Sequence, residues 1–410
     1  MRMTTKLCLS MATLTVISVP AFAQTLTWVG TLGGTTSIAY GVSLNGTVVG
    51  ASLTAQGRWH AFLWDSYNGI QDLGILPGGS QSRALAISAD GRVVVGVATN
   101  GASQDRAFCW TSAVGMFEIG TLGGARSSAT GVSWDGTYIV GWAHDASSVT
   151  RAFRWTQAGG MQDIGTLGGT TAMAYGVSRD GTVVVGVSNL PQGWQRAFAW
   201  YESTGMQNLH TLGGTRSGAR GVSAGGDVVV GGSYNDSLGV TRAFRWTHNT
   251  GITQLPILPG FLGSEAVAAS CDGSIIVGRA YNPDSEPAAV CWVEGIGVQN
   301  LNVAYANLLS LGSYLYEATG ISPDGRYIVG VGFNAQTNRS EGFLLDTGPT
   351  CVPHNGDVNR DGCVDDSDLL TVLFAFGAVS CQPNGADTNC DGIVDDTDLL
   401  TVIFHFGEGC

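Results

Sequence analysis

Short apolar runs separated by glycine-rich turns repeat along most of the chain. The clearest copy reads TLGG…A-x-GVS-x-DG-x-VVVG…RAF-x-W…GM-x-x-LG. The leucine that opens each copy recurs at an interval of 44–46 residues, at Leu32, Leu76, Leu122, Leu167, Leu212 and Leu258. A seventh, degenerate copy carries GISPDGRYIVG at 320–330 and EGFLL at 341–345. Apolar runs of this length between turn residues predict four short strands in each copy.

A hairpin turn is predicted at the same place in every copy. An Asn-Gly or Asp-Gly pair stands just before the valine-rich run, and Gly225-Gly226 takes that place in the fifth copy. Such pairs favour type I′ turns, which need positive φ at both central residues. The other pairs are Asn45-Gly46, Asp90-Gly91, Asp135-Gly136, Asp180-Gly181, Asp272-Gly273 and Asp324-Gly325.

Four strands and about 45 residues are the size of one β-propeller blade. Seven copies fill residues 24–347, so the sequence predicts a mainly β fold, a seven-bladed β-propeller. Thr25–Gly30 resembles the strand that ends each copy but precedes the first one, whereas the seventh copy lacks that strand. We therefore expect the N-terminal strand to complete the last blade and to hide both sheet edges. A β-solenoid is the alternative, because stacked coils also repeat.

The residues that recur in the copies indicate packing rather than catalysis. Recurring Phe and Trp predict a core between blades, and Cys109 and Cys291, which share one place in two copies, predict buried thiols. Recurring arginines predict a structural ring of hydrogen bonds; they are Arg106, Arg151, Arg196 and Arg242. The sequence contains no HExxH motif and no cluster of histidines. The repeated motif resembles the secreted HAF repeats, named for the element that is His60-Ala61-Phe62 here, and the resemblance implies a propeller without an assigned activity.

Two stretches near the C-terminus carry oxygen side chains on alternate residues. Asp357–Asp368 reads DVNRDGCVDDSD and Asp387–Asp398 reads DTNCDGIVDDTD, so they agree at positions 1, 3, 5, 6, 8, 9, 10 and 12. Glycine at position 6 and a carboxylate at position 12 are typical of an EF-hand-type calcium loop. Position 7 adds a backbone carbonyl, from Cys363 or Ile393, to the set of about 6–8 oxygens that Ca²⁺ prefers. One acidic run would more often be a solvated loop, but two copies in register predict two calcium sites.

Each loop leads into an apolar segment that predicts a short helix. The segments are Asp368-LLTVLFAF-Gly377 and Asp398-LLTVIFHF-Gly407, and each ends at a glycine suited to a C-cap. A pair of such loop-and-helix units at the end of an exported chain resembles the dockerin family. The resemblance implies structural calcium and a two-helix surface that binds a cohesin domain. The implied ligands are Asp357, Asn359, Asp361, Asp365 and Asp368, then Asp387, Asn389, Asp391, Asp395 and Asp398.

The positions that the resemblance assigns to partner binding differ in part from the family pattern. The hydroxyl pair before the last ligand is reduced to Ser367 and Thr397, each beside an aspartate. The basic pair one helical turn later is replaced by Leu373-Phe374 and Ile403-Phe404. Helices this apolar predict a hydrophobic docking face for a cohesin-like or other extracellular protein, or else packing against the rest of the chain.

The N-terminus has the pattern of a secretory signal peptide. Arg2 and Lys6 form a basic N-terminal region, Leu7–Val19 is an apolar run, and Ala21-Phe22-Ala23 is a cleavage motif. We expect cleavage after Ala23, a secreted or cell-surface location and no other membrane span. The predicted organisation is a signal peptide at 1–23, the propeller at 24–347, a linker at 348–356 and a dockerin-like domain at 357–410.

Charge and cysteine content refine this picture. The formal net charge is −13 and Lys6 is the only lysine, so nucleic acid is not expected as a partner. From Cys351 to Cys410 eleven acids accompany one base, Arg360, so the acidity belongs mainly to the calcium module. Five cysteines lie in the same segment, and in an oxidising compartment they predict disulfides within the module.

Three functions fit these patterns. The first is a secreted, non-catalytic repeat protein for binding or scaffolding, attached to another protein through its calcium-dependent dockerin-like module. The second is a polysaccharide-degrading enzyme of the glycoside hydrolase kind, or a carbohydrate-binding component of a cellulosome-like assembly with a glycan on the propeller. In the third, the terminal module packs within its own chain. Two or three Asp or Glu side chains at the ring centre would favour the enzyme, and a glycine-lined channel would argue against it.

Overall fold

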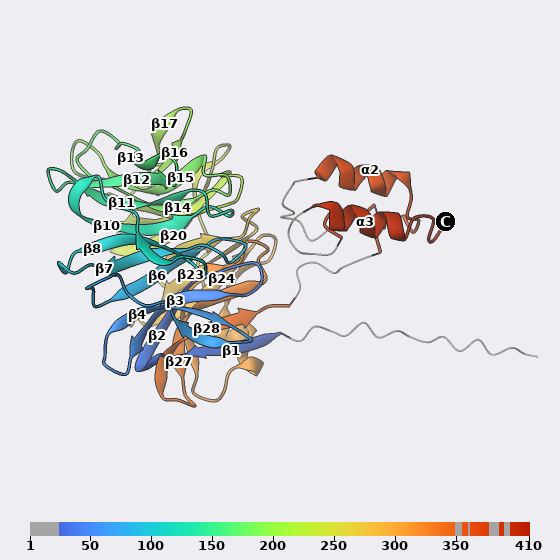
Figure 1. Ribbon diagram of the computed structural model, residues 1–410, viewed down its shortest axis with the longest axis horizontal. Coiled ribbons are helices and arrows are strands. Elements are labelled where there is room, and N and C mark those ends of the chain that lie inside the picture. Colours follow the sequence, from blue (N-terminus) through green and yellow to red (C-terminus); the bar gives the residue numbers. More distant parts are fainter. Residues whose placement is uncertain (1–23, 349–354, 360, 377–384, 389–393) are drawn as a thin grey trace, which may run out of the picture.

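The computed structural model describes residues 24–348, 355–359, 361–376, 385–388 and 394–410 (Figure 1). The predicted signal peptide and most of the predicted linker lie outside these residues. The helices are α1 (Leu301–Ala304), the short 3₁₀ helix η1 (Ala306–Leu308), α2 (Asp366–Ala375) and α3 (Asp396–Phe404). In the described ranges no helix has both the length and the apolar character that a membrane span needs.

The strands fall into groups that follow the sequence repeats. The N-terminal strand β1 is Thr25–Gly30 and precedes the first group. The first three groups are β2 (Gly33–Val42), β3 (Val48–Thr54), β4 (Trp59–Asp65) and β5 (Gly69–Asp72); β6 (Ser82–Ile87), β7 (Val94–Thr99), β8 (Asp105–Thr111) and β9 (Gly115–Glu118); β10 (Gly123–Val132), β11 (Ile139–Asp145), β12 (Thr150–Thr156) and β13 (Gly160–Asp163). The next three are β14 (Ala172–Val177), β15 (Val183–Asn189), β16 (Gln195–Tyr201) and β17 (Gly205–Asn208); β18 (Ser217–Val222), β19 (Val228–Asn235), β20 (Val240–Thr247) and β21 (Gly251–Gln254); β22 (Gly263–Ala269), β23 (Ile275–Tyr281), β24 (Pro287–Val293) and β25 (Gly297–Asn300). The last group is β26 (Tyr314–Ile321), β27 (Tyr327–Asn334) and β28 (Arg339–Asp346).

Within each group, consecutive strands pair antiparallel. The groups β6–β9, β10–β13, β14–β17, β18–β21 and β22–β25 are separate four-stranded sheets. The strands β26–β28 and β2–β5 lie on one longer path, which is joined by a single parallel pair of Thr36 with Ser340. The predictions of a mainly β fold and of four strands per repeat are therefore confirmed.

The N-terminal strand completes the last group, as the sequence predicts. β1 pairs antiparallel with β28, in a register that runs from Thr25 opposite Asp346 to Gly30 opposite Gly342. The ring of Trp28 meets the ring of Phe343 edge to face, with centroids 6.4 Å apart. The two ends of the repeat region are thus held in one sheet, which leaves β28 with a partner on each side.

The core explains why the motif pairs a valine-rich run ending in glycine with an Ala-Phe element. In the first sheet Gly50 lies directly opposite Phe62, and a Cβ atom on Gly50 would meet that ring at 2.7 Å. The same pairing of glycine with phenylalanine occurs in five further strand groups, at Gly96–Phe108, Gly141–Phe153, Gly186–Phe198, Gly231–Phe244 and Gly330–Phe343. All six phenylalanines are fully buried. The glycine leaves room for the ring, so the prediction of an aromatic core is confirmed for these residues.

The two predicted core thiols are buried and free. Cys109 lies on β8 and Cys291 on β24, and both pack in hydrophobic clusters. Burial raises the pKa of the Cys109 thiol to about 11 and that of Cys291 to about 12. Both thiols therefore stay protonated at neutral pH and behave as small apolar side chains.

A series of backbone hydrogen bonds joins each sheet to the next at the turn after its first strand. The N–H groups of Leu44, Ala89, Trp134, Arg179, Ala224 and Cys271 each donate to the carbonyl of the equivalent residue in the following sheet, at 2.9–3.3 Å. The residue that receives the last of these bonds is Pro323, which has no N–H to donate onward. The series therefore stops where the last sheet meets the first, and the pairing of β1 with β28 holds that junction.

The prediction of type I′ turns is wrong. Val42 pairs with Val48, so the first of these loops spans Ser43–Thr47 and is longer than a type I′ hairpin loop. Gly46 has a φ of +78°, but Asn45 is not among the non-glycine residues with positive φ. The hydroxyl of Ser43 instead donates to Asn45 Oδ1 and accepts from the backbone N–H of Thr47. Side-chain hydrogen bonds thus set the loop conformation.

The recurring arginines have a structural role but do not form a ring. Arg106 lies 3.5 Å from Glu118, and Arg151 lies 3.1 Å from Asp145. Each of these pairs lies within one sheet. Arg196 donates to the backbone carbonyl of Thr215, which precedes the next sheet. These three guanidinium groups therefore have separate partners, whereas Nη1 of Arg242 is buried without a hydrogen-bond acceptor among the described residues.

Deleting residues 24–30 tests the closure of the repeat region. The deletion leaves β28 with an unpaired edge and removes the contact between Trp28 and Phe343, so we expect aggregation or loss of soluble protein. Size-exclusion chromatography and thermal unfolding measure the effect, with the chain that begins at Gln24 as the control. A monomeric deletion variant with an unchanged melting temperature would support a solenoid instead.

Candidate functional site

Helices α2 and α3 begin earlier than the sequence predicts. They start at Asp366 and Asp396, not at Asp368 and Asp398. Asp365 is the N-cap of α2, and hydrogen bonds from the hydroxyl and then the backbone N–H of Ser367 lower the pKa of its carboxyl. A capping box is present at both helices. An aspartate at position 9 caps the helix well, so the helix starts immediately after it.

The predicted C-caps also differ from the structure. The C-cap of α3 is His405, although Gly407 two residues later has a φ of +85°. The C-cap of α2 is Phe376, and Gly377 lies outside the described residues. The N–H of Gly407 donates to the carbonyl of Val364 at 2.7 Å, so this glycine ties the end of α3 to the first loop.

Asp368 holds the first loop against α2. Its side chain is fully buried, and Oδ1 accepts from the backbone N–H of Val358 at 2.7 Å and of Asn359 at 3.0 Å. Oδ2 accepts from the N–H of Asp365 at 3.0 Å, which completes the capping box. Asp398, also fully buried, repeats this arrangement with Thr388 and Asp395. Position 12 therefore anchors each loop to its helix.

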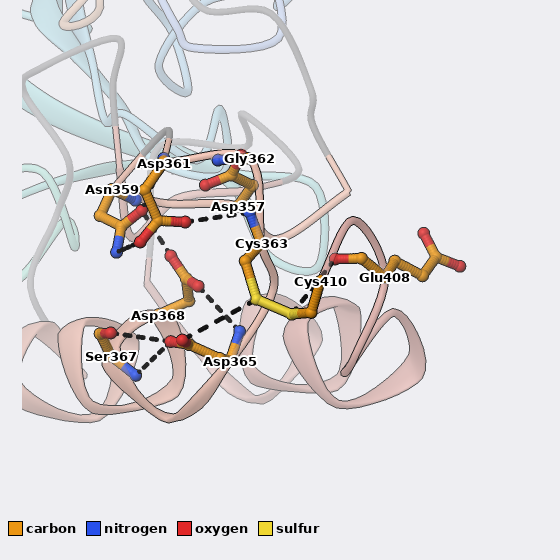
Figure 2. The surroundings of a disulfide bond; sticks show 10 residues. All are labelled: Asp357, Asn359, Asp361, Gly362, Cys363, Asp365, Ser367, Asp368, Glu408 and Cys410. Carbon is orange, nitrogen blue, oxygen red and sulfur yellow. Dashed lines mark hydrogen bonds between the residues drawn. A yellow bond between two sulfur atoms is a disulfide. The ribbon is translucent and has the colours of Figure 1, made fainter.

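The remaining oxygens of the first loop lie along its inner side (Figure 2). Asp357 Oδ2 accepts from the N–H of Gly362 at 3.0 Å, and Asp361 Oδ1 accepts from the N–H of Cys363 at 2.9 Å. Asp357 Oδ1 is buried and has no hydrogen-bond donor among the described residues. A buried carboxylate oxygen without a partner is energetically costly, and a cation bound in the loop would compensate it.

The donor set of the first loop fits Ca²⁺ in its chemistry. Four carboxylates and one amide oxygen come from Asp357, Asn359, Asp361, Asp365 and Asp368, and hard oxygen donors of this kind suit that ion. In the described part of the chain, no three His, Cys, Asp or Glu side chains converge as a formed metal site. In the second loop Asp387, Asp395 and Asp398 are described, whereas the predicted ligands Asn389, Asp391 and Ile393 lie outside the described residues.

A disulfide ties the first loop to the end of the chain. Cys363 and Cys410 are bonded, with a Cα–Cα distance of 4.8 Å (Figure 2). The prediction of a disulfide within the module is therefore confirmed for this pair. Because the thiol of Cys363 is used in the bond, this residue can offer a cation only its backbone carbonyl, as the loop pattern predicts.

Helices α2 and α3 bury a small apolar face and expose a larger one. They pack through Val372 and Val402, together with Val358, Val364 and Val394 from the loops. Phe374 is 86% exposed and Phe404 77% exposed. Further exposed apolar residues on and just after the two helices are Leu370, Leu373, Phe376, Leu400, Ile403 and Phe406. Ser367 and Thr397 are exposed near the helix starts, and both are hydrogen-bonded to the N-cap aspartates.

The repeat region carries a second candidate site in its central channel. The first strand of each sheet lines this cavity, whose volume is about 560 Å³. Most of its lining residues are Gly, Ala, Val and Ile, but Glu265 and Glu317 also line it. Arg279 lies 2.7 Å from Glu265 and 2.9 Å from Glu317, and Arg220 lies 2.9 Å from Glu265. Sequence reasoning missed this network because its members come from different repeats.

The two channel glutamates differ in their electrostatics. Burial raises the pKa of Glu317 above its usual value, and its pairing with Arg279 only partly opposes that shift. Burial acts on Glu265 in the same sense, but Arg220 and Arg279 outweigh it, so the pKa of Glu265 is lowered. The channel thus combines one carboxylate that is easier to protonate with one that stays ionised.

Comparison with known proteins supports both halves of this description. Residues 355–406 match the family of the dockerin type I domain. No curated protein sequence matches the chain. Among solved structures, oligogalacturonate lyase from Vibrio parahaemolyticus is 12% identical, with a TM-score of 0.52 over 78% of this chain and 93% of that chain. The β-propeller domain of the Trilobed protease from Pyrococcus furiosus is 10% identical, with a TM-score of 0.50 over 80% and 96%.

A third solved structure is less similar. TolB from Acinetobacter baumannii is 14% identical with a TM-score of 0.43, and the match covers 78% of this chain and 65% of the TolB chain. The lyase and protease structures show that residues of the repeat region share a propeller-like fold. The chain therefore combines a propeller-like repeat region with a dockerin type I domain at its C-terminal end.

Proposed function

We propose that the chain is an exported repeat protein that its C-terminal module attaches to another extracellular protein. The observation that carries this proposal is the pair of near-identical helices whose apolar side chains are exposed. Apolar surface gathered in this way is typical of an interaction site. The match of this segment to the dockerin type I domain supports attachment to a cohesin-like partner in a cellulosome-like assembly.

Calcium holds the module in its binding conformation in this proposal. The ligands are the loop residues named above, with the backbone carbonyls of Cys363 and Ile393 at position 7. A bound divalent cation would neutralise the carboxylates that crowd each loop and would compensate Asp357 Oδ1. The buried Asp368 and Asp398 would then hold the start of each helix in register with its loop.

The two helices form one docking surface that the partner can approach in either of two orientations. Leu373-Phe374 on α2 and Ile403-Phe404 on α3 occupy equivalent positions and are all exposed. No basic side chain lies on either helix, so the docking face offers the partner apolar contact rather than positive charge. Ser367 and Thr397 would contribute at the edge of this face.

The module attaches the repeat region to the partner protein. We assign residues 1–23 to export, 24–347 to a closed seven-bladed propeller, 348–356 to a linker and 357–410 to the docking domain. The propeller serves in binding or scaffolding, with a glycan as a further partner. The seven groups of four strands support this count, with β1 taken as the fourth strand of the last group.

A second candidate function is a polysaccharide-acting enzyme. The observation that favours it is the presence of two glutamates in the channel whose pKa values shift in opposite directions. Enzymes that hydrolyse glycosidic bonds usually use two carboxyl groups whose different environments give them different pKa values. Cleavage of a polysaccharide by the purified chain, lost in Glu317→Gln, would establish this function, and its absence would favour binding alone.

Calcium should stabilise the terminal module and leave the repeat region unchanged. The module should unfold at a lower temperature in chelator than in calcium, because carboxylate repulsion is no longer compensated. Asp357→Ala and Asp387→Ala should each remove one of two calcium sites in a titration, with Asp366→Ala, an exposed aspartate outside the ligand set, as the control. Equal unfolding temperatures in calcium and chelator would contradict calcium-dependent folding.

Docking should be redundant between the helices and insensitive to salt. Changing Leu373 and Phe374 to serine should lower affinity by about twofold, whereas changing Ile403 and Phe404 as well should lower it at least about tenfold. Capture of exported proteins on the immobilised chain in calcium, followed by titration of the captured partner, measures this. Val114→Ser with Ile296→Ser removes exposed apolar side chains from the propeller and is the control. Binding that weakens steeply from low to physiological salt would contradict hydrophobic docking.

A further inference from the structure

The sheet β18–β21 lacks side chains at a place where the other sheets carry them. Gly218 on β18 lies directly opposite Gly232 on β19. The equivalent cross-strand pairs are Ile38–Ala51, Arg83–Val97, Ser128–Trp142, Met173–Val187, Glu265–Arg279 and Glu317–Val331. Glycine in a strand interior weakens the strand, and it often marks a site where another molecule approaches the backbone closely. A Cβ atom on Gly218 would meet Val187 at 2.8 Å and one on Gly232 would meet Thr241 at 2.7 Å, so these neighbours pack closely on the two glycines, beside a groove.

This groove opens into the central channel. It has a volume of about 330 Å³ and is lined by residues of the sheets β14–β17 and β18–β21 and by Glu265 of β22. Tyr175, Arg220 and Glu265 line both the groove and the channel. The groove lies in the size range of small-ligand sites and leads continuously toward the ring centre.

Two arginines line the groove, each stacked on a tyrosine. Arg220 lies 4.7 Å from the ring centre of Tyr175, and Arg216 lies 4.8 Å from that of Tyr234. Both arginines are exposed. Arg220 uses Nε to bind Glu265, and Arg216 has no carboxylate partner in the described ranges. The stacking holds the guanidinium groups in place while their outer N–H donors stay available.

The charge balance at the channel mouth also favours an anion. Arg216, Arg220 and Arg279 oppose two carboxylates, Glu265 and Glu317, in a chain whose formal net charge is −13. Arg279 binds both glutamates through its terminal nitrogens, yet its Nε is buried without a hydrogen-bond acceptor among the described residues. The guanidinium groups of this cluster have more N–H donors than the two glutamates use, so the cluster can bind further oxyanions.

We propose that the groove beside Gly218 binds a carboxylate-bearing saccharide, with Arg216 and Arg220 as its direct contacts. The saccharide lies along the groove, and its carboxylates meet the guanidinium groups. Arg216 directly precedes β18 and Arg220 lies at the register shift within that strand, so the two side chains offer separate contacts to a ligand with more than one oxyanion. This proposal deepens the binding role proposed for the propeller and does not depend on the terminal module.

The test is calorimetric titration of the full exported chain in calcium with three probes. They are a galacturonate oligomer, a neutral glucose oligomer of the same length and inorganic phosphate. Arg216→Gln with Arg220→Gln should weaken binding of the acidic oligomer at least about tenfold, because each arginine loses its charge-assisted bonds.

The repeat supplies a matched control. Arg126 stands at the place in its own copy that Arg216 occupies, but Ser128 and Trp142 stand there in place of Gly218 and Gly232. Arg126→Gln should bind the acidic oligomer as the parent chain does. Equal unfolding temperatures of all variants show that loss of binding is not loss of folding.

Three outcomes would overturn the proposal. They are absence of binding by the parent chain, equal binding of the neutral oligomer, and tight binding of phosphate alone that the arginine substitutions do not affect. None of them bears on partner capture by the terminal module. In turn, loss of that capture in the helix variants leaves oligomer binding unchanged, so failure of one proposal is distinguishable from failure of the other.

Discussion

Most of the structure depends on one constraint: the row of sheets must close on itself. A four-stranded sheet with apolar residues on both faces is unstable in water unless each face is covered by a neighbour. Here each phenylalanine fits against a glycine on the adjacent strand, and backbone hydrogen bonds connect the turns of successive sheets. Those bonds end at Pro323, so the two ends of the row must be joined in another way. The pairing of β1 with β28 provides that connection.

The terminal module depends on different interactions. Among the described residues, its buried core consists of five valines, too few to stabilise two helices and two long loops by burial alone. Buried Asp368 and Asp398, the bond between Cys363 and Cys410 and the proposed cations supply the rest. This arrangement leaves the larger apolar face of both helices free for a partner, whereas the propeller uses its apolar residues internally. Attachment and ligand binding can therefore be separated within one chain.

Much of the fold could be predicted from the sequence, because each repeat carries the apolar runs and turn residues that its four strands need. The period, four strands per copy and the displaced strand Thr25–Gly30 were sufficient to predict how the ends meet. Finer geometry was not predictable in the same way. Asn45-Gly46 indicated a type I′ turn, but Ser43 competes for the loop through its hydroxyl. The predicted helix starts, Asp368 and Asp398, lie two residues too late, because Asp365 and Asp395 act as the N-caps.

The two candidate sites differ in how far the sequence could predict them. Alternating oxygens mark the loops in the sequence, so their donor residues were predictable, although calcium binding itself stays a prediction. The groove was not predictable, because its lining residues come from different repeats, among them Gly218 and Gly232 on neighbouring strands. Only the register of β18 with β19 brings those glycines together, and only ring packing places Glu265 beside Arg220.

Hydrogen exchange of the full chain tests the central claim, closure of the ring by β1, most directly. In a closed ring, the paired amides of β1 and β28 exchange only when the whole repeat region unfolds, at the rate of the central strands β15 and β16. The account predicts equal protection of Leu26, Leu345 and those central strands. Rapid exchange of β1 while the other sheets stay protected would show that the ring is open, and would contradict it.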